Sequence, residues 1–94
     1  MEFEEQKSKL IEKGKQLLGF VTKQDKGWGI KVDVMDDEHR NELNEWFYNA
    51  EEFVERYGLD CQKERLNGIG LINGKQVNVP GVNVILEIIE RIEH

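Results

Sequence analysis

The most regular pattern of apolar positions along the chain lies between residues 36 and 57. Apolar residues and one histidine recur there at steps of three and four: His39, Leu43, Trp46, Phe47, Ala50, Phe53, Val54 and Tyr57. This spacing places them on one face and predicts an amphipathic helix. Asp36 or Asp33 can cap its start, while Gly58 suits its end, with Leu59 folding back onto the last turn in a hydrophobic contact.

A second helix is predicted between residues 3 and 21. Its apolar positions recur at helical spacing: Phe3, Leu10, Ile11, Leu17, Leu18 and Val21. Gly14 falls on the same stripe, where the missing side chain lets another backbone or an aromatic ring come close. We therefore interpret Gly14 as a contact point and Gly19 as the end of the helix.

The last stretch, residues 82–94, is predicted to be a third helix with an unusually wide apolar face. Its apolar residues cover an arc of about 200° on a helical wheel. Such a helix is either central to the domain and covered on two sides, or it pairs with another chain. Pro80 is tolerated in its first turn. The β-branched residues leave a strand over 82–88 as the alternative.

The segments between these helices carry short-strand and turn signals. In residues 20–35, glycines flank Trp28, and apolar residues then alternate with polar ones from Ile30 to Val34. This pattern predicts a loop followed by a short strand. Residues 71–77 contain an Asn-Gly pair, typical of a type I′ hairpin turn, and could supply the partner strand. A short helical turn is predicted around 61–66.

Size and composition limit the fold to one small domain. The chain has 94 residues and one cysteine, and its apolar runs are far shorter than the roughly 18 residues that a bilayer span requires. The first residues, MEFEEQKSKL, lack the apolar stretch of a signal peptide. We predict a single domain over 1–94 in the cytoplasm, without membrane contact. Its class is mainly α, with a three-helix core and a small β-hairpin or short strands; α+β is the alternative.

Charge is unevenly distributed along the chain. The net charge is −6 overall, −8 over residues 32–60 and +2 over residues 1–31. An acidic chain does not neutralise phosphates, so we predict no direct binding to nucleic acid. The acidic block suggests one alternative function, an inhibitor encoded by a phage or its host that occupies a basic nucleic-acid-binding cleft. Its candidate contacts are Asp37, Glu38, Glu42, Glu45, Glu52 and Glu55.

No residue pattern indicates catalysis, a metal or a cofactor. The glycine-rich stretch 68–74 lacks the spacing of a phosphate-binding loop. The two histidines are far apart in the sequence, Cys61 is the single cysteine and Ser8 the single serine. We therefore predict no catalytic residue, no metal and no cofactor, with a small enzyme of unknown reaction as the second alternative.

Three segments carry a family resemblance: LIEKGKQLL from Leu10, WFYNAEEFVERYG from Trp46 and VILEIIERIE from Val84. Together they resemble the N-terminal helical segment of bacterial abortive-infection and related phage-defence proteins. The resemblance implies a recognition or oligomerisation role and transfers no catalytic residue.

The leading functional hypothesis is a non-enzymatic helical module for protein–protein interaction or oligomerisation, linked to phage defence through this resemblance. It depends on the wide apolar face of the third helix. The partner is a second copy, giving a homodimer, or a larger protein. The predicted contacts are Ile85, Ile88, Ile89 and Ile92, with Trp28 as an exposed aromatic anchor.

Overall fold

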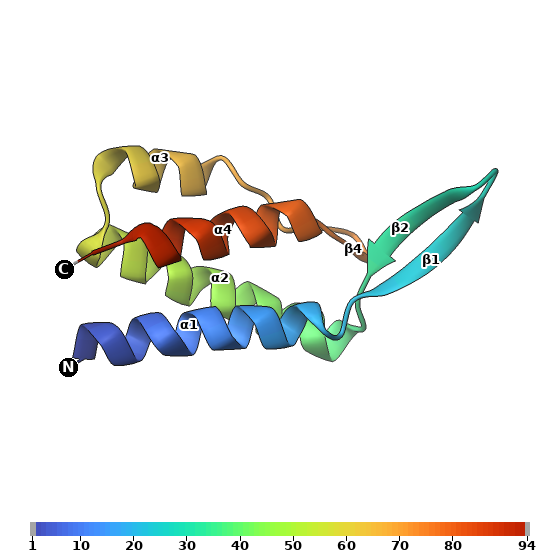
Figure 1. Cartoon of the computed structure of the whole chain (residues 1–94). Helices are drawn as coiled ribbons and strands as arrows, with labels where there is room; N and C mark the ends of the chain where they lie inside the picture. Colours follow the sequence, from blue (N-terminus) through green and yellow to red (C-terminus); the bar gives the residue numbers. More distant parts are fainter. Residues whose placement is uncertain (1, 94) are drawn as a thin grey trace.

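The computed structural model describes residues 2–93, which form four helices and a four-stranded antiparallel sheet (Figure 1). The mainly α fold with short strands agrees with the sequence-based prediction. In chain order the elements are α1 (Glu2–Leu18), β1 (Thr22–Gly27), β2 (Ile30–Val34), α2 (Asp37–Tyr57), α3 (Asp60–Asn67), β3 (Ile72–Asn73), β4 (Gln76–Val77) and α4 (Val79–Arg91). No helix within this range combines the length and the apolar composition needed to cross a membrane.

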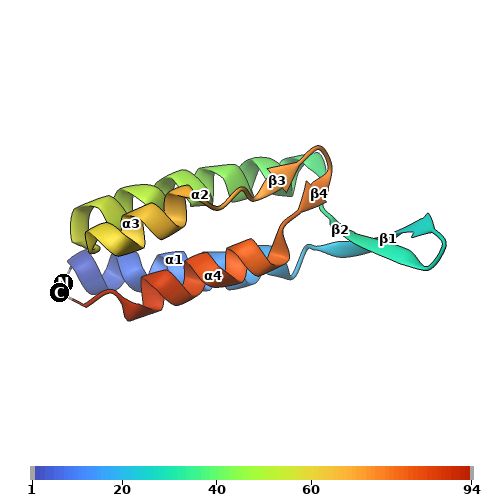
Figure 2. The same cartoon turned by 90° about the horizontal axis from the view of Figure 1, so that it is seen from above.

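The helices run alongside one another, with α4 packed against α1, α2 and α3 (Figures 1 and 2). Because α4 has neighbours on several sides, its wide apolar arc is covered within the chain. The large side chains that lie almost fully buried come from all four helices and from Ile92, which directly follows α4: Leu17, Leu43, Trp46, Val54, Leu66, Val82, Ile85, Ile88, Ile89 and Ile92. Residues 82–88 lie within the helix α4, so the strand alternative is wrong, and Pro80 stands in the first turn of the helix as predicted.

Gly14 lies at a close approach between α1 and its neighbours. A Cβ atom there would lie 2.7 Å from Cζ2 of Trp46 and 2.7 Å from Cδ2 of Leu86. The indole Nε1 of Trp46 donates a hydrogen bond to the carbonyl oxygen of Leu10 at 2.8 Å. The predicted contact point is confirmed: the absent side chain makes room for the Trp46 ring.

The two ends of α2 differ in how well the sequence predicts them. Asp36 caps the start, as one of the two predicted candidates, by accepting a hydrogen bond from the backbone N–H of His39. The predicted fold-back of Leu59 is wrong, because Gly58 is extended at φ −88° and Leu59 is 67% exposed. Position 58 instead needs a glycine because there is no room for a side chain: a Cβ atom would lie 2.6 Å from the carbonyl oxygen of Val54.

The sheet has the order β1-β2-β4-β3, and its main pairing was not predicted. The segment predicted as a loop before Ile30 contains β1, which pairs with β2 along its length. β4 meets β2 only at Val34 and Gln76. β1 escaped prediction because its sequence, TKQDKG, is polar on both faces and every residue is exposed. Its place depends on backbone pairing to β2 rather than on burial.

The second hairpin, β3–β4, is present as predicted but turns differently. Asn73 pairs with Gln76, and Gly74 alone in this turn has positive φ, at +65°. A glycine at the first central position suits a type II′ turn rather than type I′. Arg40 of α2 donates a hydrogen bond to the carbonyl oxygen of Gly74 at 2.7 Å, which ties the turn to the helical body.

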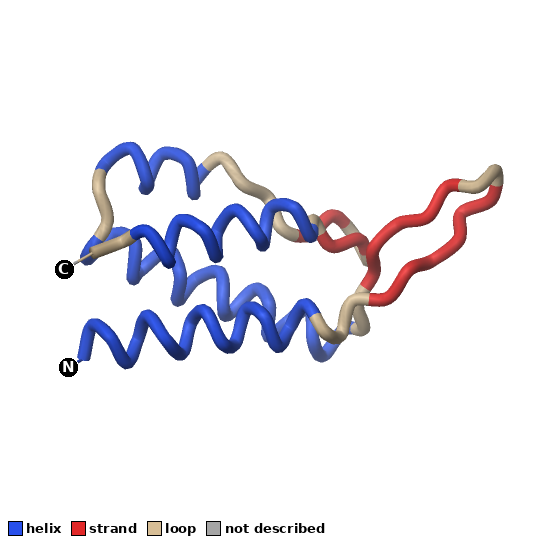
Figure 3. The backbone as a smooth tube through the Cα atoms, in the orientation of Figure 1, coloured by secondary structure: helices blue, strands red, loops and turns tan. Residues whose placement is uncertain are grey.

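The β1–β2 hairpin extends beyond the helices at one end of the molecule, as the red strands in Figure 3 show. The extension makes the chain long and narrow, with dimensions of 47 × 23 × 17 Å. Since no residue of β1 is buried, the hairpin adds little to the core. It is the part of the molecule whose presence the packing of the helices does not explain.

Candidate functional site

The tip of the hairpin presents a tryptophan to solvent. Trp28 is 100% exposed, which confirms the prediction of an exposed aromatic side chain between two glycines. The backbone passes through the left-handed region at three successive residues, with φ of +91° at Gly27, +56° at Trp28 and +75° at Gly29. The carboxylate of Asp25 accepts a hydrogen bond from the N–H of Gly27 at 2.8 Å and holds the start of this turn.

The fold does not account for a tryptophan at position 28. Among the described residues Trp28 is the single non-glycine residue with positive φ. The left-handed conformation costs an L-residue about 1–2 kcal/mol, a cost that glycine avoids. A fully exposed indole buries no apolar surface that could offset this conformational cost. A strained, exposed aromatic residue is therefore a candidate for function.

The four isoleucines predicted as partner contacts lie inside the protein. Ile85 and Ile89 are 0% exposed, and Ile88 and Ile92 are 2% exposed. The prediction of an uncovered apolar face on α4 is therefore wrong. The apolar face is covered because α1, α2 and α3 pack around α4. The helix is thus central to the domain, which was one of the two interpretations of its wide apolar arc. These side chains stabilise the monomer and offer no surface to a partner.

The six acidic residues of the inhibitor hypothesis all belong to α2 and border different parts of its surroundings. Glu42, Glu45 and Glu52 border the groove between α1 and α2, whereas Glu55 borders the depression between α2 and α3. Asp37 and Glu38 belong to the first turn of α2, where Asp37 forms an ion pair with Arg40. The inhibitor hypothesis stays a prediction.

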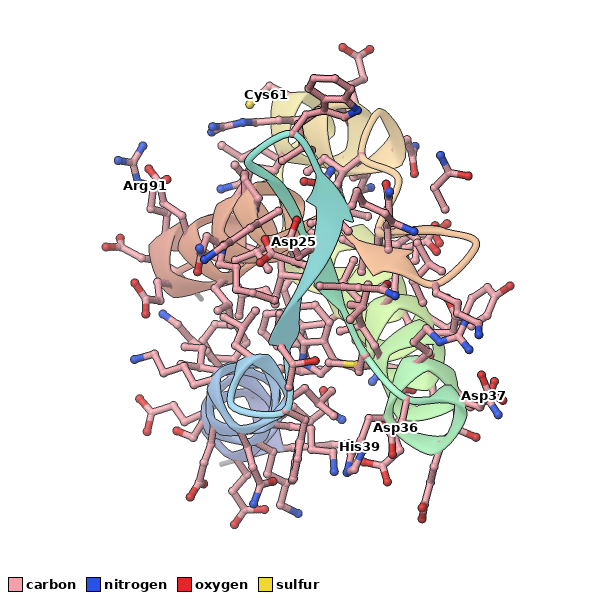
Figure 4. The ribbon with its side chains drawn as sticks, turned by 90° about the vertical axis from the view of Figure 1, so that its right-hand side faces the viewer. Asp25, Asp36, Asp37, His39, Cys61 and Arg91 are labelled. Carbon is pink, nitrogen blue, oxygen red and sulfur yellow. The ribbon has the colours of Figure 1, made fainter. Side chains whose placement is uncertain are left out.

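The groove between α1 and α2 has a volume of about 640 Å³, and its charges are mixed. Lysines 9 and 13 of α1 face glutamates 42 and 45 of α2, and Lys13 pairs with Glu42 at 3.0 Å. Within residues 2–93 no group of three or more His, Cys, Asp or Glu side chains could hold a metal ion. Cys61 is exposed on α3 (Figure 4).

A second aromatic side chain lies at the base of the hairpin. Phe20 is 44% exposed, and its ring stacks on that of His39 with centroids 3.8 Å apart. Nδ1 of His39 is in turn hydrogen-bonded to the carboxylate of Asp36, and Figure 4 shows the two side chains together at the start of α2. This hydrogen bond holds the pKa of Asp36 below its ordinary value. The sequence signal for the stack was absent, since Phe20 and His39 belong to separate elements.

The lowered pKa of Asp36 predicts a pH-dependent contribution to stability. A carboxyl group whose pKa is lower in the folded than in the unfolded chain stabilises above its ordinary pKa, here 3.8, and loses this effect as the pH falls through the folded value. Asp36→Asn keeps a helix cap and removes the charge. We expect the variant to be less stable than the wild type at pH 7 and to approach it at pH 3, by urea unfolding. A stability difference independent of pH would contradict the assignment.

Comparisons with protein-family models, curated proteins and solved structures find no match for this chain. The resemblance to abortive-infection proteins is therefore untested and stays a prediction. The class that the structure defines is a mainly α protein with a small antiparallel sheet, and the functional argument has to proceed from its own residues.

Proposed function

We propose that this protein is a non-enzymatic protein–protein interaction module that binds through the tip of the β1–β2 hairpin. The observation that carries the proposal is Trp28, fully exposed and in a backbone conformation that glycine would adopt without strain. The proposal keeps the interaction role predicted from the sequence and moves it from α4 to the hairpin. A cytoplasmic location and a link to phage defence remain predictions.

Several features of the hairpin suit it to this role. It extends beyond the helical body, so a partner can reach Trp28 without meeting the helices (Figure 1). Ile30, the first residue of β2, is 57% exposed and enlarges the apolar surface beside the tip. Tryptophan is one of the residue types enriched among interface hot spots, and it brings a large rigid surface at low entropic cost.

The test is Trp28→Gly, compared with Tyr48→Ala as a matched loss of an exposed aromatic side chain on α2. Tyr48 is 70% exposed and lies outside the hairpin. We expect Trp28→Gly to unfold at the same temperature as the wild type or slightly higher, because glycine relieves the strain at this position. In pull-downs from lysate, partners captured by the wild type and Tyr48→Ala should be lost from Trp28→Gly.

Two outcomes contradict the proposal. One is a set of captured proteins that does not change when Trp28 is replaced. The other is a Trp28→Gly chain that loses its fold, since the tryptophan would then have a structural role that its complete exposure conceals. Thermal unfolding followed by circular dichroism separates the second outcome from a loss of binding.

A further inference from the structure

β1 is an edge strand with an open side. In the order β1-β2-β4-β3 no strand lies beyond it among residues 2–93, and all six of its residues are exposed. The N–H and C=O groups that point away from β2 are therefore available to another strand. An exposed edge of this kind binds by antiparallel strand addition when the incoming sequence fits.

We propose that the strand added to this edge is β1 of a second copy, paired antiparallel about a twofold axis at Gln24. This inference rests on the proposed function and names the partner. With Gln24 opposite itself, Lys23 of each copy lies opposite Asp25 of the other; beyond Asp25 the register of β1 shifts, so the regular pairing ends there. A twofold axis makes both lysine–aspartate pairs form together, as in other isologous interfaces.

The charges already present within the hairpin extend this match. Lys23 lies opposite Asp33 of β2, with its Nζ 2.8 Å from the carboxylate, and Asp25 lies opposite Lys31. All four side chains share one face because opposite residues in an antiparallel pair point the same way. In the dimer, that face carries alternating positive and negative charges along each strand and across all four strands.

Other symmetric registers are disfavoured by the same residues. Centring the axis on Asp25 would place the two aspartates opposite each other, and centring it on Lys23 would do the same with the lysines. Like charges directly opposite are destabilising. Lysines on an edge strand usually prevent pairing, but in the register centred on Gln24 Lys23 of each copy meets an aspartate of the other.

The register also places the exposed aromatic side chains. Trp28 and Phe20 flank β1 on opposite sides of Gln24, so the tip that carries Trp28 extends toward the base of the second copy's hairpin, where Phe20 lies. Phe20 is partly exposed and stacked on His39, which provides an apolar surface at the base of the hairpin. The pairing thus gives the fully exposed tryptophan a place to bury part of its surface. The helical bodies lie at opposite ends of the joined hairpins.

The experiment exchanges charges while keeping the pairs inside each hairpin. One variant carries Lys23→Asp with Asp33→Lys, and the other carries Asp25→Lys with Lys31→Asp. Each preserves its own cross-strand pair but sets like charges opposite each other between copies. By sedimentation equilibrium at concentrations up to about 1 mM, a range that covers weak interfaces, we expect the wild type to dimerise reversibly. We expect each variant alone to dimerise at least about tenfold more weakly.

Mixing the two variants provides the decisive measurement. In the mixed pair, the aspartate introduced at position 23 of the first variant would face the lysine introduced at position 25 of the second. The native Asp25 of the first variant and the native Lys23 of the second also face each other, so dimerisation should return toward the wild-type level. The chain with all four substitutions should likewise pair with itself. Circular dichroism of each variant checks that the hairpin and helices remain folded.

The outcomes separate this inference from the proposed function. A wild type that stays monomeric, variants that dimerise as well as the wild type, or a mixture that fails to restore dimerisation would each overturn the Gln24 register. Capture of another protein that depends on Trp28 would still stand in those cases. A dimer with the expected charge dependence but no Trp28-dependent capture would leave self-association as the single interaction of the hairpin.

Discussion

Replacing Ile88 with glutamate should unfold the protein rather than release a partner. Ile88 is 2% exposed on the face of α4 that meets the other helices, so a carboxylate there would be buried without a counter-charge. An unpaired buried charge and a lost apolar side chain together cost several kcal/mol, comparable to the whole stability of a small domain. We expect circular dichroism of Ile88→Glu to show loss of the helical signal at 25 °C.

The matched control introduces the same charge on the exposed side of the same helix. Asn83 is exposed on α4, so Asn83→Glu should leave the fold and its unfolding temperature nearly unchanged. If Ile88→Glu instead remained folded and changed only the oligomeric state, the arc of α4 would be an interface after all, and the burial described above would not hold in solution.

The second large effect is expected at Gly14. A valine there would bring methyl groups into the space that the ring of Trp46 occupies, where even a Cβ atom lies 2.7 Å away. Overpacking of this kind typically costs about 1–3 kcal/mol, and it would also disturb the hydrogen bond from Trp46 to Leu10. Urea unfolding of Gly14→Val should show a lower midpoint and a loss of stability in this range.

Gly14→Ala gives a smaller and more informative change. Alanine gains up to about 1 kcal/mol of helix propensity over glycine, which offsets part of the strain. Glu12→Val, on the exposed side of α1, controls for the β-branched side chain in a helix. A Gly14→Val chain as stable as Glu12→Val would show that α1 can move away from Trp46.

The helices could be predicted from the sequence because their buried residues recur at helical spacing. Leu43, Trp46 and Phe53 repeat at steps that fit one helical face, and Gly14 interrupts a stripe where a neighbour had to approach. β1 could not be predicted in this way, since its polar residues carry no alternation of burial and its place depends on pairing to β2. The hairpin as a unit was therefore missed, although the exposure of Trp28 was expected.

The function of α4 was misjudged for a different reason. The width of an apolar arc shows how much of a helix surface is to be buried. It does not show whether the residues that bury it belong to the same chain. The cover came partly from α3, a short helix with mostly polar residues that places Leu66 in the core. The stack of Phe20 on His39 was likewise invisible, because it joins residues from two elements whose relative position only the fold determines.

The chain has two tryptophans, and they stand at opposite extremes of exposure: Trp46 is 2% exposed and Trp28 is 100% exposed. As fluorophores they report on different events. A collisional quencher such as iodide reaches the indole at the hairpin tip and spares the one in the core, so the quenched fraction of the emission follows docking of the hairpin, and the protected fraction follows unfolding. One untagged sample in one cuvette can thus distinguish a partner that covers the tip from a condition that loosens the helices.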